Sequence, residues 1–282
     1  MRRSAQNAPM PEGDTIYRTA EHLRPLVGQQ VTGARAWPRP GVRRVADLSR
    51  LIGATVASVE ARGKQLLIGF DNGLTIRSHL RMSGSWRRFL PGERWNRPAY
   101  QASAILETTD GVAVAFNTPV VELLTDADRR RSPVLAALGP DLLGETFDRD
   151  EALRRLRERD VQPLGVALLD QRAVAGIGNV YKSEVAFMVG LDPWAPVGAF
   201  SDEQLLNALS SARRLLQANV ARGPRNTTGR RSLGQGLWVY NRTGRPCRRC
   251  SGPIRSRRQG ELARVTYWCP SCQPAPSEAQ LA

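Results

Sequence analysis

Residues 247–272 read CRRCSGPIRSRRQGELARVTYWCPSC and contain all four cysteines of the 282-residue chain. Two Cys-x2-Cys pairs stand 18 residues apart, and such pairs supply the four thiolates of a structural zinc site. Because all four ligands of the metal come from the protein, no coordination position is left for a reactive water. Two disulfides or a redox pair are the alternatives, and both are unusual in a cytoplasmic protein that has no other cysteine. The predicted ligands are Cys247, Cys250, Cys269 and Cys272.

The segment between the two pairs predicts a β-hairpin that turns at Gln259-Gly260 and carries arginines. The stretch from Arg213 to Cys272 holds 14 Arg, no Lys and one acid, Glu261, and thus carries +13 of the chain's net charge of +15. Arg outnumbers Lys 39 to 2, as the codons of a GC-rich genome would produce. Codon usage does not explain the excess of base over acid. The charge therefore predicts nucleic acid as the partner, held by phosphate contacts.

Upstream of this module the sequence is helical in character. Helices are expected within 148–160, 162–171, 178–190 and 201–223, with start signals at Asp148, Gly178-Asn179 and Ser201. The stretch LLDQRAVAGIGNVYKSEVAF (168–187) predicts two helices around a glycine-containing turn. Free N–H groups at Gly178-Asn179 would form an anion site, to which Asn179 adds a side-chain donor. The alternative is an ordinary helix-turn-helix packed in a core.

The first part of the chain is typical of a β-sandwich. Short alternating runs are separated by turn pairs such as Asp110-Gly111, and one helix, Asp14 to Leu26 with Asp14 as its cap, is expected at the start. The predicted fold class is α+β and multidomain. Its predicted parts are a β-sandwich domain (10–125), a linker near 126–146, a helical domain (146–236) and a zinc-finger hairpin (237–273).

Membrane and secreted classes are not supported by the sequence. No apolar stretch reaches the ~18 residues of a membrane span, and mean hydropathy is negative. The basic first residues MRRSAQNAP are not followed by an apolar region, so they do not form a secretory signal. The expected compartment is the bacterial cytoplasm, in association with the nucleoid.

Five motifs occur in order: MPEGDT (10–15), RGKQLL (62–67), SHLRMSGSW (78–86), QRAVAGIGNVYKSE (171–184) and CRRC…ARVTYWCPSCQ (247–273). Together they resemble the formamidopyrimidine-DNA glycosylase and endonuclease VIII family of base-excision repair. The resemblance covers nearly all of residues 10–273. It implies a β-sandwich, a helix-two-turn-helix domain and a zinc finger that bind damaged DNA, with the activities of a DNA glycosylase and an abasic-site lyase that nicks by β/δ-elimination.

The resemblance implies that Pro11 is the nucleophile. The reacting group is the secondary amine of an N-terminal proline, and an α-amine titrates near neutral pH. A proline inside a chain has no such amine. Pro11 therefore serves only if translation starts at Met10 and that Met is removed, so residues 1–9 are expected to be an overextended start.

The other roles are assigned by position in the motifs. Glu12 matches the acid/base that opens the deoxyribose ring. Lys64 matches an active-site lysine that transfers protons in β-elimination. Arg264 matches a zinc-finger arginine that binds phosphate and assists δ-elimination. Met82 matches the wedge that fills the gap left by the flipped base. The residues that match phosphate contacts are His79, Asn179 and Tyr240. Without the resemblance, Lys64 reads as a solvated strand end, His79 as a structural histidine and Met82 as a core residue.

One departure favours the endonuclease VIII-like branch. The guanine-oxidation branch carries a PRRFG-like stretch whose Arg and Phe help fill the gap, whereas this chain has AFNTPVVELL (115–124). The start PEGDT also resembles the endonuclease VIII side. Oxidised pyrimidines and abasic sites are therefore the expected substrates, and a glycosylase for 8-oxoguanine and formamidopyrimidine is the alternative.

Two further hypotheses remain open from the sequence. One is a catalytically silent zinc-finger DNA-binding protein of the same fold, and the other is a lyase that uses Lys64 as the imine nucleophile. A monomer is expected. The sequence leaves undetermined the preferred lesion, the opposite base, the preference for single or double strands, the balance between the two eliminations and the native start.

Overall fold

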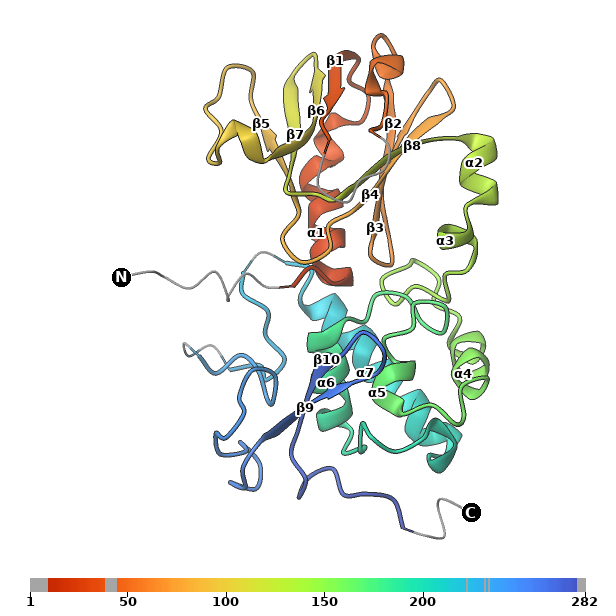
Figure 1. The fold of residues 1–282 in the computed structure, drawn as a ribbon, viewed down its shortest axis with the longest axis vertical. Helices are drawn as coiled ribbons and strands as arrows, with labels where there is room; N and C mark the ends of the chain where they lie inside the picture. Colours follow the sequence, from red (N-terminus) through yellow and green to blue (C-terminus); the bar gives the residue numbers. More distant parts are fainter. Residues whose placement is uncertain (1–9, 39–44, 222, 231, 233, 278–282) are drawn as a thin grey trace. The chain divides into compact units, whose positions relative to one another are not determined.

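The structure, a computed structural model, describes residues 10–38, 45–221, 223–230, 232 and 234–277 (Figure 1). The predicted start at residues 1–9 lies outside these ranges. Contacts between Cα atoms divide the chain into two compact units, 1–136 and 137–282. Each unit has a buried apolar core of its own.

The first unit is the predicted β-sandwich, built from two four-stranded antiparallel sheets. One sheet has the order β1-β6-β7-β5 and the other β2-β3-β4-β8 (Figure 1). Its strands are β1 (Val31–Ala36), β2 (Val56–Arg62), β3 (Gln65–Phe70), β4 (Leu74–His79), β5 (Ser85–Phe89), β6 (Ala102–Thr108), β7 (Gly111–Phe116) and β8 (Val120–Thr125). Short 3-10 turns η3 (Leu48–Leu51) and η4 (Ala99–Gln101) precede β2 and β6.

The opening helix differs from its prediction at both ends. Helix α1 (Gly13–Leu23) begins one residue before Asp14, and Glu12 is its N-cap residue. Asp14 lies inside the first turn, is buried and pairs with Arg18 at 3.5 Å. The predicted last turn is the 3-10 turn η2 (Arg24–Leu26), because Pro25 has no N–H with which to continue the α-helical pattern. Helix α1 packs on β2 and β5 through its apolar face.

The predicted linker contains structure. Helices α2 (Asp126–Arg131) and α3 (Pro133–Ala136) follow β8 directly. The side chain of Thr125 accepts a hydrogen bond from the Asp128 backbone N–H, and the Asp128 carboxylate accepts one from Thr125 N. This reciprocal capping box explains why a helix begins where composition indicated a connection.

The second unit begins with the helical region. Its elements are α4 (Arg149–Arg157), α5 (Leu164–Ala167), α6 (Asn179–Met188), the 3-10 turn η5 (Val197–Ala199) and α7 (Asp202–Ala218). Asp148, Gly178 and Ser201 are N-cap residues, as predicted. Helix α5 is shorter than the predicted 162–171 segment, since residues 169–174 form the turns that lead toward α6.

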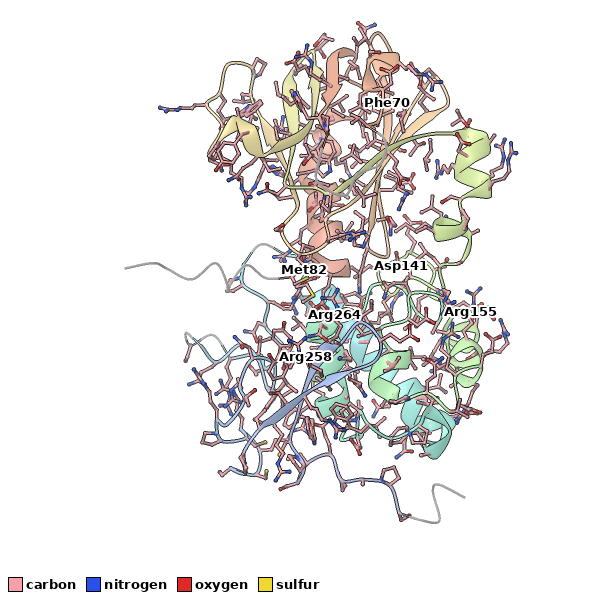
Figure 2. All side chains as sticks on the ribbon, in the orientation of Figure 1. Phe70, Met82, Asp141, Arg155, Arg258 and Arg264 are labelled. Carbon is pink, nitrogen blue, oxygen red and sulfur yellow. The ribbon has the colours of Figure 1, made fainter. Side chains whose placement is uncertain are left out.

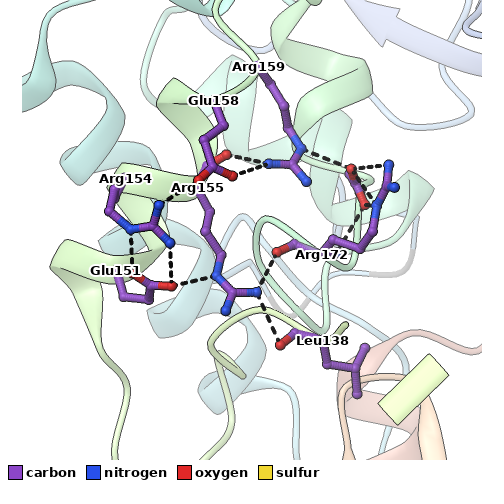
Figure 3. Close-up of polar contacts among 8 residues, drawn as sticks. Leu138, Glu151, Arg154, Arg155, Glu158, Arg159 and Arg172 are labelled. Carbon is purple, nitrogen blue, oxygen red and sulfur yellow. Dashed lines mark hydrogen bonds and ion pairs between the residues drawn. The ribbon is translucent and has the colours of Figure 1, made fainter. Parts of the chain in front are cut away.

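Charged residues of α4 contact that turn and a second loop segment (Figure 3). Glu151 accepts hydrogen bonds from Arg154 and Arg155. The Arg155 guanidinium also donates to the backbone carbonyls of Leu138, at 3.4 Å, and Arg172, at 3.0 Å. A helix that is polar on its exposed side therefore fastens two loop segments that are distant in sequence.

The turn before α6 is further fixed by two side chains. Burial opposes ionisation of Asp170, but hydrogen bonds from Arg172 and Arg159 outweigh it and lower the pKa of that carboxyl to about 2. Gln171 accepts from Gly176 N and donates to the Ile177 carbonyl. Gly176 has φ +111°, which a side chain would strain. These contacts thus fix the backbone conformation of the turn that leads into α6.

The C-terminal module is the predicted β-hairpin, with strands β9 (Arg255–Gln259) and β10 (Arg264–Trp268). The turn spans residues 260–263, and Gly260 (φ +68°) and Ala263 (φ +48°) both adopt left-handed backbone. Among the described residues, the helices all lack the length or apolar character needed to span a membrane.

Candidate functional site

Pro11 and Glu12 stand immediately before α1. The backbone carbonyl of Glu12 accepts hydrogen bonds from Thr15 N at 2.9 Å and Ile16 N at 3.1 Å. Its side chain makes no capping bond, although Glu12 is 0% exposed. The Glu12 carboxyl is therefore buried directly after Pro11, and it is the backbone carbonyl that starts the helix.

Lys64 and His79 lie at the same end of one sheet. Leu66 of β3 pairs with Ser78 of β4, so the residues just outside this pair, Lys64 and His79, share that sheet end. Gly63, with φ +57°, makes the tight turn that presents Lys64. Lys64 is only partly exposed, unlike the solvated strand end that composition alone allowed.

The protonation state of His79 follows from its surroundings. Its Nδ1 accepts a hydrogen bond from Arg81 N at 3.0 Å. Burial, followed by the charges of Lys64, Arg81 and Arg77, lowers the pKa of His79 to about 4. At pH 7 the ring is thus neutral and carries its proton on Nε2, where it can be donated to an anion.

Met82 projects from the turn between β4 and β5 (Figure 2). It is 49% exposed and is therefore not a core residue. The turn is closed by Gly84 N donating to the Leu80 carbonyl at 2.9 Å, and a Cβ at Gly84 would lie 2.5 Å from that oxygen. The turn thus leaves about half of an apolar side chain exposed.

The AFNTPVVELL stretch forms the end of β7, a short turn and β8. Asn117, with φ +47°, makes the turn, and its N–H donates to the Gln101 carbonyl at 2.8 Å. Phe116 is fully buried. The turn between β7 and β8 therefore presents neither an arginine nor an aromatic ring.

In the second unit, α6 is bound to β10 at three successive residues. Asn179 Nδ2 donates to the Val265 carbonyl at 2.9 Å, and Ser183 Oγ accepts from Tyr267 N at 3.3 Å. The residue between these two, Thr266, accepts from Lys182 Nζ at 2.7 Å. Asn179 is buried and its side-chain amide is bonded to the hairpin, so the predicted phosphate contact is not tested by these bonds.

The two lysines of the chain differ in their exposure to solvent. Lys182 is 0% exposed, whereas Lys64 is partly exposed. A fully buried amine in hydrogen-bonding contact with Thr266 cannot reach a DNA sugar. Of the two, only Lys64 has the exposure that an alternative imine nucleophile requires.

Tyr240 is positioned by a carboxylate that sequence reasoning missed. Glu184, fully buried on α6, accepts hydrogen bonds from the backbone N–H groups of Trp238, Val239 and Tyr240 at 2.8–2.9 Å. The rings of Tyr240 and Tyr267 lie 4.9 Å apart. The signal in the sequence is the run KSE (182–184), because three consecutive polar side chains cannot all lie on one side of a helix.

The four cysteines converge as predicted. Their Sγ atoms all lie within 4.8 Å of one another, with Cys247 and Cys272 at 3.8 Å and Cys250 and Cys269 at 3.4 Å. These separations exceed the ~2.05 Å of a disulfide and match the ~3.8 Å edges of a tetrahedron with ~2.3 Å metal–sulfur bonds. A hydrogen bond from the Gly252 backbone is the main cause that lowers the pKa of Cys250 to about 7. The four cysteines are therefore positioned to bind a metal ion.

Comparison with known proteins agrees with this arrangement. The family model "Formamidopyrimidine-DNA glycosylase N-terminal domain" matches residues 10–120, and the model "Formamidopyrimidine-DNA glycosylase H2TH domain" matches residues 138–230. The chain belongs to the formamidopyrimidine-DNA glycosylase and endonuclease VIII family, which comprises DNA glycosylases and abasic-site lyases.

Within this family the chain is on the endonuclease VIII-like side. It is 45% identical over 271 residues to "Probable endonuclease 8 2" of Streptomyces coelicolor, covering 95% of each chain. It is 43% identical over 270 residues to "DNA-(apurinic or apyrimidinic site) lyase Nei2" of Mycolicibacterium smegmatis, covering 94% of this chain and 100% of the relative. A formamidopyrimidine-DNA glycosylase of Exiguobacterium is 31% identical, with 94% and 99% covered.

The fold is that of solved family members. The Lactococcus lactis glycosylase in complex with DNA containing an abasic site superposes with a TM-score of 0.78, at 24% identity, covering 94% of this chain and 100% of the other.

Proposed function

We propose that the chain is a bifunctional DNA glycosylase and abasic-site lyase that excises oxidised bases, chiefly pyrimidines, and nicks the strand at the resulting site. The observation that carries the proposal is the pair Pro11-Glu12, in which a buried carboxyl unused as a helix cap directly follows the proline. A nucleophile and a proton donor are thereby adjacent at the start of α1.

The chemistry requires a chain that begins at Pro11. Its secondary amine attacks C1′ of the damaged nucleotide, the N–C1′ bond forms and the base leaves with the glycosidic electrons. Glu12 gives a proton to the sugar ring oxygen as the ring opens to an iminium ion. Loss of a proton from C2′ then expels the 3′ phosphate (β-elimination), and a second elimination expels the 5′ phosphate (δ-elimination).

The remaining predicted residues serve these steps. Lys64, beside the neutral His79, transfers protons in β-elimination, and His79 donates its Nε2 proton to a phosphate. Met82 enters the gap left by the extruded nucleotide, where its apolar side chain replaces lost stacking. Asn179, Tyr240 and Arg264 bind phosphates, and Arg264 also assists δ-elimination.

The metal ion that fits the four thiolates is one structural Zn²⁺. Four protein ligands leave no open position, so zinc supports the hairpin and takes no part in the reaction. The partner is damaged DNA, bound by a monomer in the bacterial cytoplasm, at the nucleoid.

The short turn between β7 and β8 supports a pyrimidine substrate over 8-oxoguanine. It lacks the Arg and Phe that the guanine-oxidation branch places in the gap, and Phe116 is buried. A panel of duplexes carrying different lesions tests this. Faster release of 8-oxoguanine than of oxidised pyrimidines contradicts the proposal.

The nucleophile is tested by comparing two chains under borohydride with abasic-site DNA. A chain translated from Met10 and processed to Pro11 is expected to form a covalent adduct. The 282-residue chain should bind the same DNA without trapping, because its Pro11 nitrogen is an amide. Pro11→Gly in the short chain should retain some trapping, since a free amine remains.

The outcomes separate the competing functions. If the long chain, verified intact by mass after reaction, traps as well as the short one, Pro11 is not the nucleophile. Loss of trapping in Lys64→Arg would then identify Lys64. If neither chain traps but both bind, the protein is a silent DNA-binding member of the fold.

A further inference from the structure

Lys182 lies in the first turn of α6 and carries a buried cation that none of the proposed chemical steps uses. It is fully buried, and removing an ammonium group from water is costly unless hydrogen bonds compensate. Its Nζ donates to Thr266 Oγ1 at 2.7 Å. Thr266 is fully buried on β10, two residues after Arg264. The cation therefore acts on the strand that carries the finger arginine (Figure 2).

From Thr266 the hydrogen bonds continue across the hairpin. Thr266 Oγ1 donates to Gln259 Oε1 at 2.7 Å, and Gln259 Nε2 donates to the Pro193 carbonyl at 2.7 Å. Gln259 is the β9 residue that pairs with Arg264. Lys182 can only donate and the Pro193 carbonyl can only accept, so these two ends together fix the direction of every bond in the series. Both strands are thereby tied down at the end of the hairpin that bears Arg264.

The surroundings leave this arrangement little freedom. A Cβ at Gly165 of α5 would lie 2.4 Å from Gln259 Oε1, so the amide is packed directly on the helix backbone. Side chains two residues apart on a strand share a face, which places Arg264 on the same face as Thr266. Between them, the Val265 carbonyl accepts from Asn179. The backbone that bears Arg264 is therefore held from α6.

We propose that Lys182 is a positioning residue that fixes the direction of Arg264 through Thr266 and Gln259, and so sets the ratio of δ- to β-elimination. The proposal rests on the proposed function and extends it to a residue that never touches DNA. The guanidinium of Arg264 stands at the end of a flexible side chain. A shift of the strand that carries Arg264 therefore moves this group relative to the departing phosphate. Small errors of position at a reacting centre lower rates steeply.

The test is Lys182→Met, which keeps the length of the side chain and removes the ammonium. In the chain processed to Pro11, borohydride trapping and zinc content should stay at the parent's level. The ratio of δ- to β-product on abasic DNA should fall by roughly tenfold, the equivalent of one charge-assisted hydrogen bond. Lys182→Arg should restore part of the ratio, and Thr266→Val should reproduce the loss.

The matched control is Val185→Ala, a buried residue of the same helix that faces the helical core. It should lower the melting temperature without changing the product ratio. In an Arg264→Ala background, Lys182→Met should have no further effect on the ratio, because the lysine acts through that arginine.

Each other outcome decides against one of the two proposals. A parental product ratio in Lys182→Met overturns the positioning role. So does a parallel fall of trapping, zinc content and both products, which would show a purely structural lysine. An additive effect in the Arg264→Ala background excludes action through Arg264. If the parent itself fails to trap, the proposed function is wrong and the role of Lys182 does not arise.

Discussion

The two units hold their functional side chains by different physical means. In the sandwich unit, backbone geometry does so: Glu12 caps α1 through its carbonyl, Gly63 turns the chain at Lys64, and the turn closed by Gly84 holds Met82 outward. In the second unit, buried polar side chains and thiolates do so, chiefly Lys182, Glu184 and the cysteines. The first arrangement needs only an apolar core beneath it, whereas the second depends on each polar partner and on four cysteines positioned to bind a metal ion.

The difference predicts that the units respond separately to metal loss. Removal of zinc, or Cys269→Ala, should unfold the hairpin and weaken DNA binding by at least roughly 100-fold, because structural zinc contributes on the order of 10 kcal/mol to such modules. The sandwich should keep its melting transition. Metal analysis, calorimetry and binding titration measure this. Active protein that contains no metal would contradict it.

In the sandwich unit, the largest loss of activity is expected from a substitution of Glu12. Glu12→Gln should lower base excision by about 100- to 10,000-fold, the range for loss of a general acid/base. Strand nicking at ready-made abasic sites should fall less, since no base has to leave. Single-turnover rates on the two substrates give the comparison. Equal losses would remove Glu12 from the excision step.

In the second unit, the matching test is a substitution of Arg264. Arg264→Ala should spare the fold, since this side chain is only partly buried. It should weaken DNA binding and reduce the slope of log affinity against log salt by about one unit, as expected for one lost phosphate contact. Binding measured at several salt concentrations tests this. An unchanged slope together with parental cleavage would exclude the assignment.

The smallest predicted effect is a pH dependence confined to the sandwich unit, which contains both histidines. The pKa of His79 is lowered from 6.5 to about 4 in the folded state. The unfolded chain therefore binds the extra proton, and stability falls as pH drops from about 6.5 to about 4, by at most about 1.4 kcal/mol per pH unit.

His79→Gln keeps a donor and should flatten that part of the stability curve. Denaturant titrations at several pH values measure it. The same slope in parent and variant would show that His79 does not cause it.

What the sequence predicted well is local. Cysteine spacing located the metal site, and cap residues such as Ser201 and Asp148 located helix starts, because both signals lie within a few residues of what they specify. The start of α1 was misplaced because Glu12 caps with its backbone carbonyl, which every residue has. The sequence predicted a linker in place of α2 and α3 because the signal for α2 is a capping box in a charged run, and α3 has only four residues, too few for a periodic pattern.

The long-range part of the site could not be read from the sequence. Lys182 is 84 residues from Thr266, and Glu184 is 56 residues from Tyr240. Such pairs exist only in the folded chain, where residues 238–240 and the hairpin both contact α6. The surface setting of Met82 likewise depends on the φ +49° of Arg81 and on the contact of Gly84 with Leu80, neither of which a hydrophobic pattern encodes.

Because Lys182 is buried, an amine-reactive label can be directed to the other lysine of the chain. The chain contains two lysines, and the other, Lys64, lies at the proposed catalytic edge of the sandwich. An amine-reactive reagent applied to folded protein should therefore modify Lys64 and the chain's α-amine and leave Lys182 untouched. Protection of Lys64 by abasic DNA, read by peptide mass, would report occupancy of the site without any engineered cysteine or tag.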